Sequence, residues 1–160
     1  MTELLLLRHA HAGDPMAWTK PDDIRPLSRK GRDQAARMAA FLAASDVRPD
    51  VIISSPRTRA VETATPVADA LGLKVRIDER LAEPFGLAEI ERLLKDCGDP
   101  ERPMLVGHDP DFTSLVAVLC HAPSVPVRKG ALVRIDAPRP LCPGCGTLRW
   151  LLPPELIPGA

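Results

Sequence analysis

The stretch Leu4-Leu5-Leu6-Leu7-Arg8-His9 decides the fold of this chain of 160 residues. Four consecutive apolar residues are typical of a strand that is buried on both faces, as in a parallel sheet covered by helices. Arg8 and His9 follow the leucines directly, so we expect the first strand to end on two chemically active side chains.

Similar short apolar runs alternate with helical segments along the rest of the chain. This alternation predicts an α/β fold, a three-layer α/β/α sandwich with a mostly parallel central sheet, and a single domain over residues 1–160. The expected strands are residues 4–7, 51–53, 74–77, 104–106, 131–135 and 147–152, and the expected helices are 29–44, 56–71, 87–96 and 110–120.

The ends of these helices carry recognisable capping residues. Ser28 is the predicted N-cap of the first helix, and Ser55, followed by Pro56, is the predicted N-cap of the second. Asp109 is the predicted N-cap of the last helix, with Pro110 as its first residue. Pro66 lies inside the second helix, where we expect it to kink or split the helix.

Composition excludes several classes of function. Lys and Arg number 21, as do Asp and Glu, so net charge gives no drive toward nucleic acid or a membrane surface. The longest apolar run, residues 38–44, is far shorter than the roughly 20 residues of a membrane span. No export signal is visible, and the four cysteines are therefore expected to be reduced. We expect a cytoplasmic monomer.

Three segments leave strand ends with reactive side chains: Arg8–His11, Ser54–Arg57 and Gly107–Asp109. Ligands of parallel α/β sheets bind beyond the carboxyl ends of the strands. The last two segments also open helices, whose free backbone N–H groups favour anions. Two arginines and two histidines meeting there would form a phosphate pocket, and a neutral imidazole is a competent nucleophile near pH 7.

These segments also carry a family resemblance. Leu-Leu-Arg8-His9-Ala10 resembles the N-terminal Arg-His-Gly signature of the histidine phosphatase superfamily, the phosphoglycerate-mutase-like proteins. Ser54–Ala60, with Glu62-Thr63-Ala64, is similar to its second-arginine motif, and Val106-Gly107-His108 to its second-histidine motif. The small size and the His108-Asp109-Pro110 variant look most like the SixA-type branch, the phosphohistidine phosphatases.

The resemblance implies roles for individual residues. His9 would be the nucleophile, and Arg8, Arg57 and His108 would hold the phosphate. Glu83, in Leu81-Ala82-Glu83, is the candidate general acid, with Glu79 and Glu89 as alternatives. The glycine of the family's Arg-His-Gly signature is Ala10 here.

Other candidate residues have simpler interpretations. We expect Arg59 to be a solvated helix residue, His11 to line the mouth of the cleft or to be solvated, and His121 to be structural. His9-x-His11 resembles a metal pair, but only His108 and His121 remain as further histidines, so no metal is expected. Cys142-Pro143-Gly144-Cys145 is predicted to be a turn between two strands.

These features predict a phosphatase that needs no cofactor and acts through a phosphohistidine intermediate on His9. Phosphohistidine expels an imidazole, whose conjugate acid has a pKa of about 6.5, so it leaves without a strong acid. The predicted substrate is therefore phosphohistidine in a signalling protein, for example a histidine-phosphotransfer domain. The alternatives are a small-molecule phosphomonoesterase of the same superfamily and a phosphate-recognition module without turnover.

Overall fold

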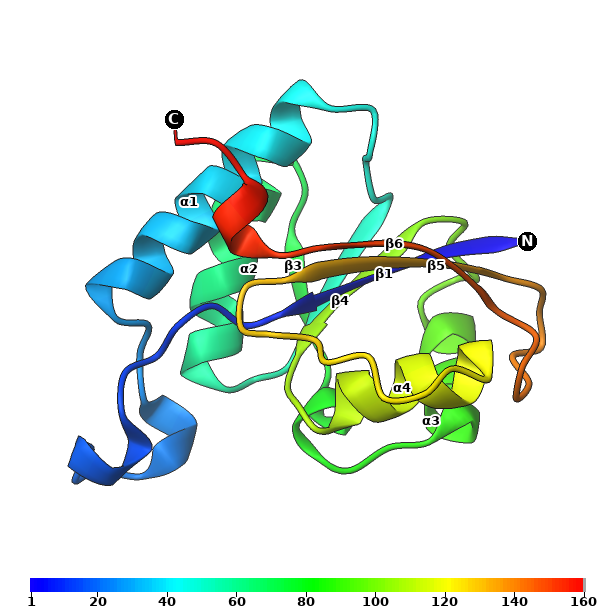
Figure 1. The fold of residues 1–160 in the computed structure, drawn as a ribbon, viewed down its shortest axis with the longest axis horizontal. Helices are drawn as coiled ribbons and strands as arrows, with labels where there is room; N and C mark the ends of the chain where they lie inside the picture. The colour runs from blue at the N-terminus through cyan, green and yellow to red at the C-terminus, as the bar shows by residue number, and fades with distance from the viewer. Residues whose placement is uncertain (160) are drawn as a thin grey trace.

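The central feature of the computed structural model, which describes residues 1–159, is a sheet of six strands (Figure 1). Neighbouring strands follow the order β3-β2-β4-β1-β5-β6. β3, β2, β4 and β1 run parallel, and β5 is antiparallel to both β1 and β6. The strands are β1 (Thr2–Arg8), β2 (Val51–Ser54), β3 (Val75–Ile77), β4 (Pro103–Gly107), β5 (Leu132–Ala137) and β6 (Thr147–Leu152).

Helices cover both faces of the sheet. α1 (Arg29–Ala44) and α2 (Thr58–Leu71) pack on one face, and α3 (Leu87–Asp96) and α4 (Asp111–Cys120) pack on the other (Figure 1). The leucines of β1 alternate between these layers: Leu5 and Leu7 join the core under α1 and α2, whereas Leu4 and Leu6 join the core under α3 and α4. Each fully buried leucine contributes about 2 kcal/mol of hydrophobic stabilisation. The predicted three-layer sandwich with a mostly parallel sheet is confirmed.

Short 3-10 turns lie in several of the loops. The long loop between β1 and α1 contains η1 (Pro15–Ala17) and η2 (Asp22–Ile24), η3 (Glu79–Ala82) follows β3, and η4 (Pro154–Leu156) follows β6. The loop before α1 is thus irregular, as predicted.

The predicted helix starts are correct for α1 and wrong for α2 and α4. Ser28 Oγ accepts the Gly31 N–H at 3.0 Å, as an N-cap should. α2 begins at Thr58, with Arg57 as the N-cap residue, because the hydroxyl of Ser55 contacts a histidine instead. α4 begins at Asp111, one residue after Pro110, although the Asp109 carboxylate still accepts the Thr113 N–H at 3.0 Å.

Pro66 does not split α2, so that part of our expectation is wrong, and a kink stays a prediction. The helix continues to Leu71 and ends at Gly72, which adopts a left-handed conformation with φ 68°. Ala64, Val67 and Ala68 are buried on either side of the proline. Tertiary packing therefore holds the helix together across the missing backbone N–H.

The carboxyl ends of β1, β2, β3 and β4 lie at one edge of the sheet, where His9, Ser55, η3 and His108 follow them. No helix within residues 1–159 is both long enough and apolar enough to span a membrane.

Candidate active site

His9 lies directly after β1, with only 5% of its surface exposed. Its Nδ1 lies 2.7 Å from the carbonyl oxygen of Ala10, which can only accept, so the ring proton is on Nδ1 and the lone pair is on Nε2. The Ala10 N–H donates to Thr63 Oγ1 at 3.0 Å, which ties this turn to α2. Ala10 does not have a positive φ, so its methyl group causes no strain where the family has glycine.

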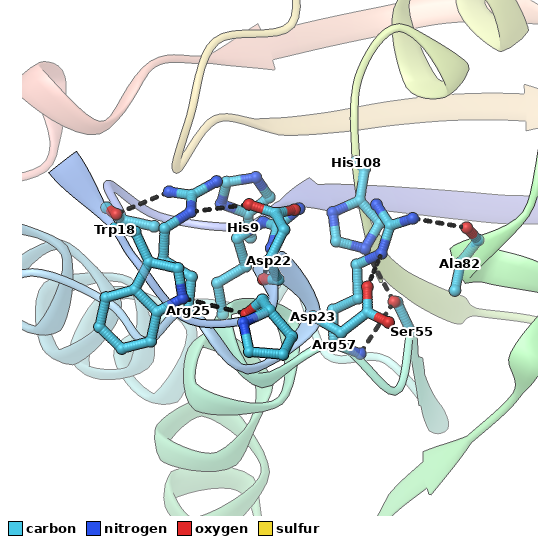
Figure 2. A network of polar contacts seen from close by, with 12 residues as sticks. His9, Trp18, Asp22, Asp23, Arg25, Ser55, Arg57, Ala82 and His108 are labelled. Atoms are coloured by element: carbon cyan, nitrogen blue, oxygen red, sulfur yellow. Dashed lines mark hydrogen bonds and ion pairs between the residues drawn. The ribbon is translucent and has the colours of Figure 1, made fainter. Parts of the chain in front are cut away.

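His108 follows β4, the neighbour of β1, and its ring centroid lies 5.3 Å from that of His9 (Figure 2). Its Nε2 lies 2.7 Å from Ser55 Oγ. Ser55 Oγ accepts the Arg57 N–H, and within residues 1–159 its own hydroxyl proton has no acceptor other than Nε2, so we assign that proton to the bond with Nε2. The ring proton of His108 is then on Nδ1, which is buried and has no hydrogen-bond partner.

Arg8 and Arg57 are half-buried and each is held by a backbone carbonyl. Arg8 Nη1 donates to Val127 at 2.9 Å and lies 3.8 Å from an oxygen of Asp109. Arg57 Nη2 donates to Ala82 at 3.0 Å, as Figure 2 shows. Arg57 Nε lies 3.4 Å from Asp23 Oδ1, which makes an ion pair without the geometry of a hydrogen bond.

Arg59 is the site residue that sequence reasoning missed. We expected a solvated side chain, but only 5% of Arg59 is exposed. It donates to the Asp22 carbonyl at 2.9 Å and to the Asp22 carboxylate at 3.0 Å. Helical spacing was the available signal: Arg59 lies one turn before Thr63, on the face of α2 that is buried.

The buried donors of the site share one property. Among residues 1–159, four buried side-chain nitrogen atoms lack a hydrogen-bond partner, namely Arg8 Nε, Arg57 Nε, Arg59 Nε and His108 Nδ1. An unsatisfied buried donor costs about 1–3 kcal/mol, and most folded proteins avoid it. The three arginines lie close enough to His108 to lower its pKa, so these four donors indicate a site built for an acceptor-rich anion.

Burial and positive charge keep both histidines neutral. The pKa of His9 is lowered to about 3, mainly by burial and further by the charges of Arg59, Arg8 and Lys129, although the bond to Ala10 opposes this. The pKa of His108 is also lowered to about 3, mainly by burial and then by His9 and the three arginines. At pH 7 the Nε2 lone pair of His9 is therefore available.

The three acidic candidates lie in different surroundings. Glu83 and Glu79 are exposed and line a cavity of about 280 Å³ together with Asp23 and Arg57, which we call the acidic cavity. Glu89 lies elsewhere, because its Oε2 accepts the Gly86 N–H at 2.7 Å and closes the first turn of α3. The structure thus brings Glu83 and Glu79 to the site and leaves Glu89 out.

The remaining candidates lie beside the site or far from it. His11 is partly exposed, and its Nδ1 lies 2.6 Å from Ser28 Oγ. His121 ends α4 in a left-handed conformation with φ 47°. Cys142 and Cys145 lie in the predicted turn between β5 and β6, with free thiols. No group of three or more His, Cys, Asp or Glu side chains in residues 1–159 is arranged to hold a metal ion.

Comparison with known proteins agrees with this geometry. The chain is 26% identical to the phosphohistidine phosphatase SixA of Escherichia coli (strain K12) over 168 aligned positions, which cover 95% of this chain and 94% of that protein. A solved structure of the protein histidine phosphatase SixA complexed with tungstate has a TM-score of 0.82 and 24% identity, covering 98% of this chain and all of the other.

A more distant structural relative has the same fold. The mycobacterial glucosyl-3-phosphoglycerate phosphatase matches with a TM-score of 0.69 and 19% identity, over 92% of this chain and 97% of that one. The family model of the histidine phosphatase superfamily (branch 1) matches residues 4–98, which include most of β1, all of β2 and the site residues Arg8, His9, Arg57 and Arg59. The chain therefore belongs to branch 1 of the histidine phosphatase superfamily.

Proposed function

We propose that this histidine phosphatase hydrolyses phosphohistidine in a signalling protein, by way of a phosphohistidine intermediate on His9. The observation that carries the proposal is the group of four unpartnered buried donors around a neutral imidazole. A phosphoryl group supplies the oxygen acceptors that these donors lack.

The first chemical step is attack of His9 Nε2 on phosphorus. A bond forms between Nε2 and phosphorus while the bond from phosphorus to the substrate imidazole breaks, and that imidazole leaves with its electron pair and takes up a proton from solvent water. The guanidinium groups of Arg8, Arg57 and Arg59 and the Nδ1–H of His108 donate to the phosphoryl oxygens. One such donor is typically worth 100- to 1,000-fold in rate.

Water completes the reaction. A water molecule attacks the phosphorus atom, the bond to Nε2 breaks, and inorganic phosphate leaves with neutral His9 restored. The bond from Nδ1–H to the Ala10 carbonyl holds the imidazole in one tautomer through both steps. No step in this sequence calls for a cofactor.

Phosphohistidine is chosen as the substrate because the candidate general acid is poorly positioned. Glu83 is exposed and makes no hydrogen bond that would orient it within residues 1–159. Such an acid helps little with an alkoxide leaving group, whereas an imidazole with a conjugate acid of pKa about 6.5 needs little help. The name of the 26% identical relative, phosphohistidine phosphatase SixA, supports this choice, and a solved SixA complex with tungstate, an oxyanion, supports a phosphate site in this fold.

A small phosphate ester is the second candidate substrate. The acidic cavity beside Arg57 favours it, because Glu83 or Glu79 could protonate a leaving alcohol from there. The fold shared with a glucosyl-3-phosphoglycerate phosphatase is compatible with this alternative. A recognition module without turnover is the third candidate.

Rapid-quench labelling of the wild type and His9→Ala tests the proposal. With a phosphohistidine-containing histidine-phosphotransfer domain as substrate, we expect a labelled phosphoenzyme in the wild type and none in His9→Ala. The wild type should also show a higher kcat/KM for phosphohistidine than for aliphatic phosphate esters. A label that persists in His9→Ala would remove His9 as nucleophile, faster turnover of esters would favour the second candidate, and binding without phosphate release would favour the third. The cytoplasmic location and the monomeric state stay predictions.

A further inference from the structure

A second cavity, of about 360 Å³, opens next to Arg8 on the side away from the acidic cavity. It lies between the first turn of α1, the segment that precedes β5, and η4. We call it the basic pocket. Its charged and titratable lining residues are Arg8, His11, Lys30, Arg128, Lys129 and Glu155.

Within residues 1–159, three of the positive charges of the basic pocket have no ion-pair partner. None of the ion pairs within residues 1–159 includes Lys30, Arg128 or Lys129, although many other arginines of the chain pair with carboxylates. Glu155 is the single acidic residue in the lining. Lys129 is partly buried, and its pKa is lowered by burial and by the nearby charges of Arg8, Arg25 and Arg59. Uncompensated cations in a concave site attract an anion.

The basic pocket is continuous with the phosphate site through Arg8. The side chain of Arg8 lines the pocket, and its Nε is one of the four unpartnered donors around His9. The Gly130 N–H donates to the carbonyls of Arg8 at 3.1 Å and His9 at 3.0 Å, which fixes the neighbouring Lys129 beside the catalytic turn. A substrate phosphoryl group at His9 therefore brings the adjoining part of the substrate to the pocket.

The opposite side of the site has the opposite charge. The acidic cavity beyond Arg57 has Asp23, Glu79 and Glu83 in its lining. An anionic group next to the phosphate would be repelled there and attracted by Lys30, Arg128 and Lys129. The two flanks together allow one orientation of an asymmetric anionic substrate.

We propose that the basic pocket binds a second anionic group of the substrate, which in a phosphoprotein is a carboxylate side chain next to the phosphohistidine. The inference rests on the proposed function for its choice of substrate. A carboxylate on a small phosphate ester has the same chemistry, so the test includes both sources.

The test compares substrates that differ only in the second anion. One arm uses two peptides with a single phosphohistidine, flanked by Glu in one and by Gln in the other, and the second arm uses 3-carboxyphenyl phosphate against phenyl phosphate. Exposed ion pairs are worth about 0.2–1 kcal/mol each. A few such contacts predict that the wild type has a kcat/KM roughly tenfold higher for the substrate with the extra carboxylate than for its partner without it. Most of this preference should appear in KM and should fall at high salt.

The double variant Lys30→Gln/Arg128→Gln should lose the preference, because both side chains are exposed and carry positive charge in the basic pocket. The matched control is Lys74→Gln, which removes an exposed positive charge ahead of the edge strand β3 and should keep the preference. Melting temperatures near that of the wild type would verify folding of all variants.

The outcomes separate the two proposals. A preference in the aryl phosphates with no hydrolysis of either phosphopeptide would support the basic pocket and overturn phosphohistidine as substrate. Hydrolysis of both peptides at equal rates, together with equal rates for the two aryl phosphates, would overturn the basic pocket and leave the proposed function in place. If the double variant keeps the preference for the extra carboxylate, the proposal for the basic pocket is also overturned.

Discussion

Arg57 and Arg59 are two residues apart, yet their side chains meet different surroundings. Arg59 is almost completely buried and makes two bonds to Asp22, whereas 29% of the Arg57 side chain is exposed beside Asp23. The Nε of each lacks a hydrogen-bond partner, although Arg57 Nε lies 3.4 Å from Asp23 Oδ1. The more deeply buried guanidinium works in a lower dielectric, so we expect it to stabilise the transition state more strongly.

Replacement of each arginine by lysine tests this difference. Lysine keeps the charge but loses the planar fork. We expect Arg59→Lys to lower kcat/KM about 100- to 1,000-fold and Arg57→Lys to lower it less, with circular dichroism spectra like that of the wild type. Steady-state kinetics on an aryl phosphate measures both. A larger loss in Arg57→Lys than in Arg59→Lys would contradict the assignment.

Glu83→Gln tests the general acid. A positioned acid is typically worth about 100- to 10,000-fold for a leaving group that needs a proton. We therefore expect a strong loss of activity on aliphatic esters and a weak loss on phosphohistidine and aryl phosphates. Glu89→Gln is the control, because Glu89 caps α3 and should affect stability rather than leaving-group dependence. Equal losses of Glu83→Gln on all substrates would exclude the acid role.

Among individual residues, the sequence predicted the site residues that lie at or next to the end of a strand. Arg8 ends a buried strand, and His9 and His108 directly follow buried strands, so the edge of a parallel sheet brings them together. Arg59 was misjudged because a helical arginine is usually solvated, and only the packing of η2 against α2 shows that Asp22 covers it. Lys129-Gly130-Ala131 is similar to the SixA-type branch, but no role was predicted for Lys129, because its place beside His9 depends on backbone bonds from Gly130.

At the scale of elements, the first turn of α1 supports the catalytic turn. A Cβ atom added to Gly31 would overlap the His11 carbonyl oxygen, so the helix can approach this segment only at a glycine. The Ser28 N–H also donates to that carbonyl at 3.0 Å. α1 therefore sets the path of the chain from His9 to His11.

Gly31→Ala should consequently move the segment that carries His9. We expect a loss of stability of about 1–3 kcal/mol, as for other overpacked sites, together with a fall in kcat that exceeds the change in KM. Urea unfolding and steady-state kinetics measure the two effects. Gly159→Ala is the control, because its Cβ would meet Arg37 at an ordinary 3.7 Å. Normal kcat in Gly31→Ala would show that the helix does not position His9.

The elements themselves were mostly predictable, and their starts less so. The helices at residues 29–44 and 87–96 and the strand at 147–152 have the predicted bounds. α2 begins later than predicted because the hydroxyl of Ser55 binds His108 and does not cap the helix. A sequence does not reveal whether a serine after a strand will serve a helix or a neighbouring imidazole.

The whole molecule should become less stable in mild acid. The unfolded chain takes up protons on His9 and His108 as the pH falls below about 6.5, whereas the folded chain resists until about pH 3. The free energy of unfolding is therefore highest above pH 6.5 and decreases toward pH 3, by at most about 1.4 kcal/mol per pH unit for each histidine.

Urea unfolding between pH 7 and pH 5 measures this slope, since carboxyl groups titrate mainly below that window. We expect His9→Asn to have a flatter dependence on pH than the wild type. His121→Asn is the control, because His121 is exposed and asparagine tolerates its positive φ. A wild-type slope in His9→Asn would mean that His9 is charged in the folded protein.

The four unpartnered donors also have an evolutionary consequence. They weaken the empty protein, so substitutions that remove an unpartnered donor and leave the other hydrogen bonds of the site intact should raise the melting temperature while phosphate binding is lost. A library of variants of this chain, screened for thermal stability alone, would then accumulate substitutions in the phosphate site before substitutions in the core of the sandwich. Laboratory evolution for thermal stability alone would yield a folded protein without activity. Selection for turnover is needed to retain the arginines of the site.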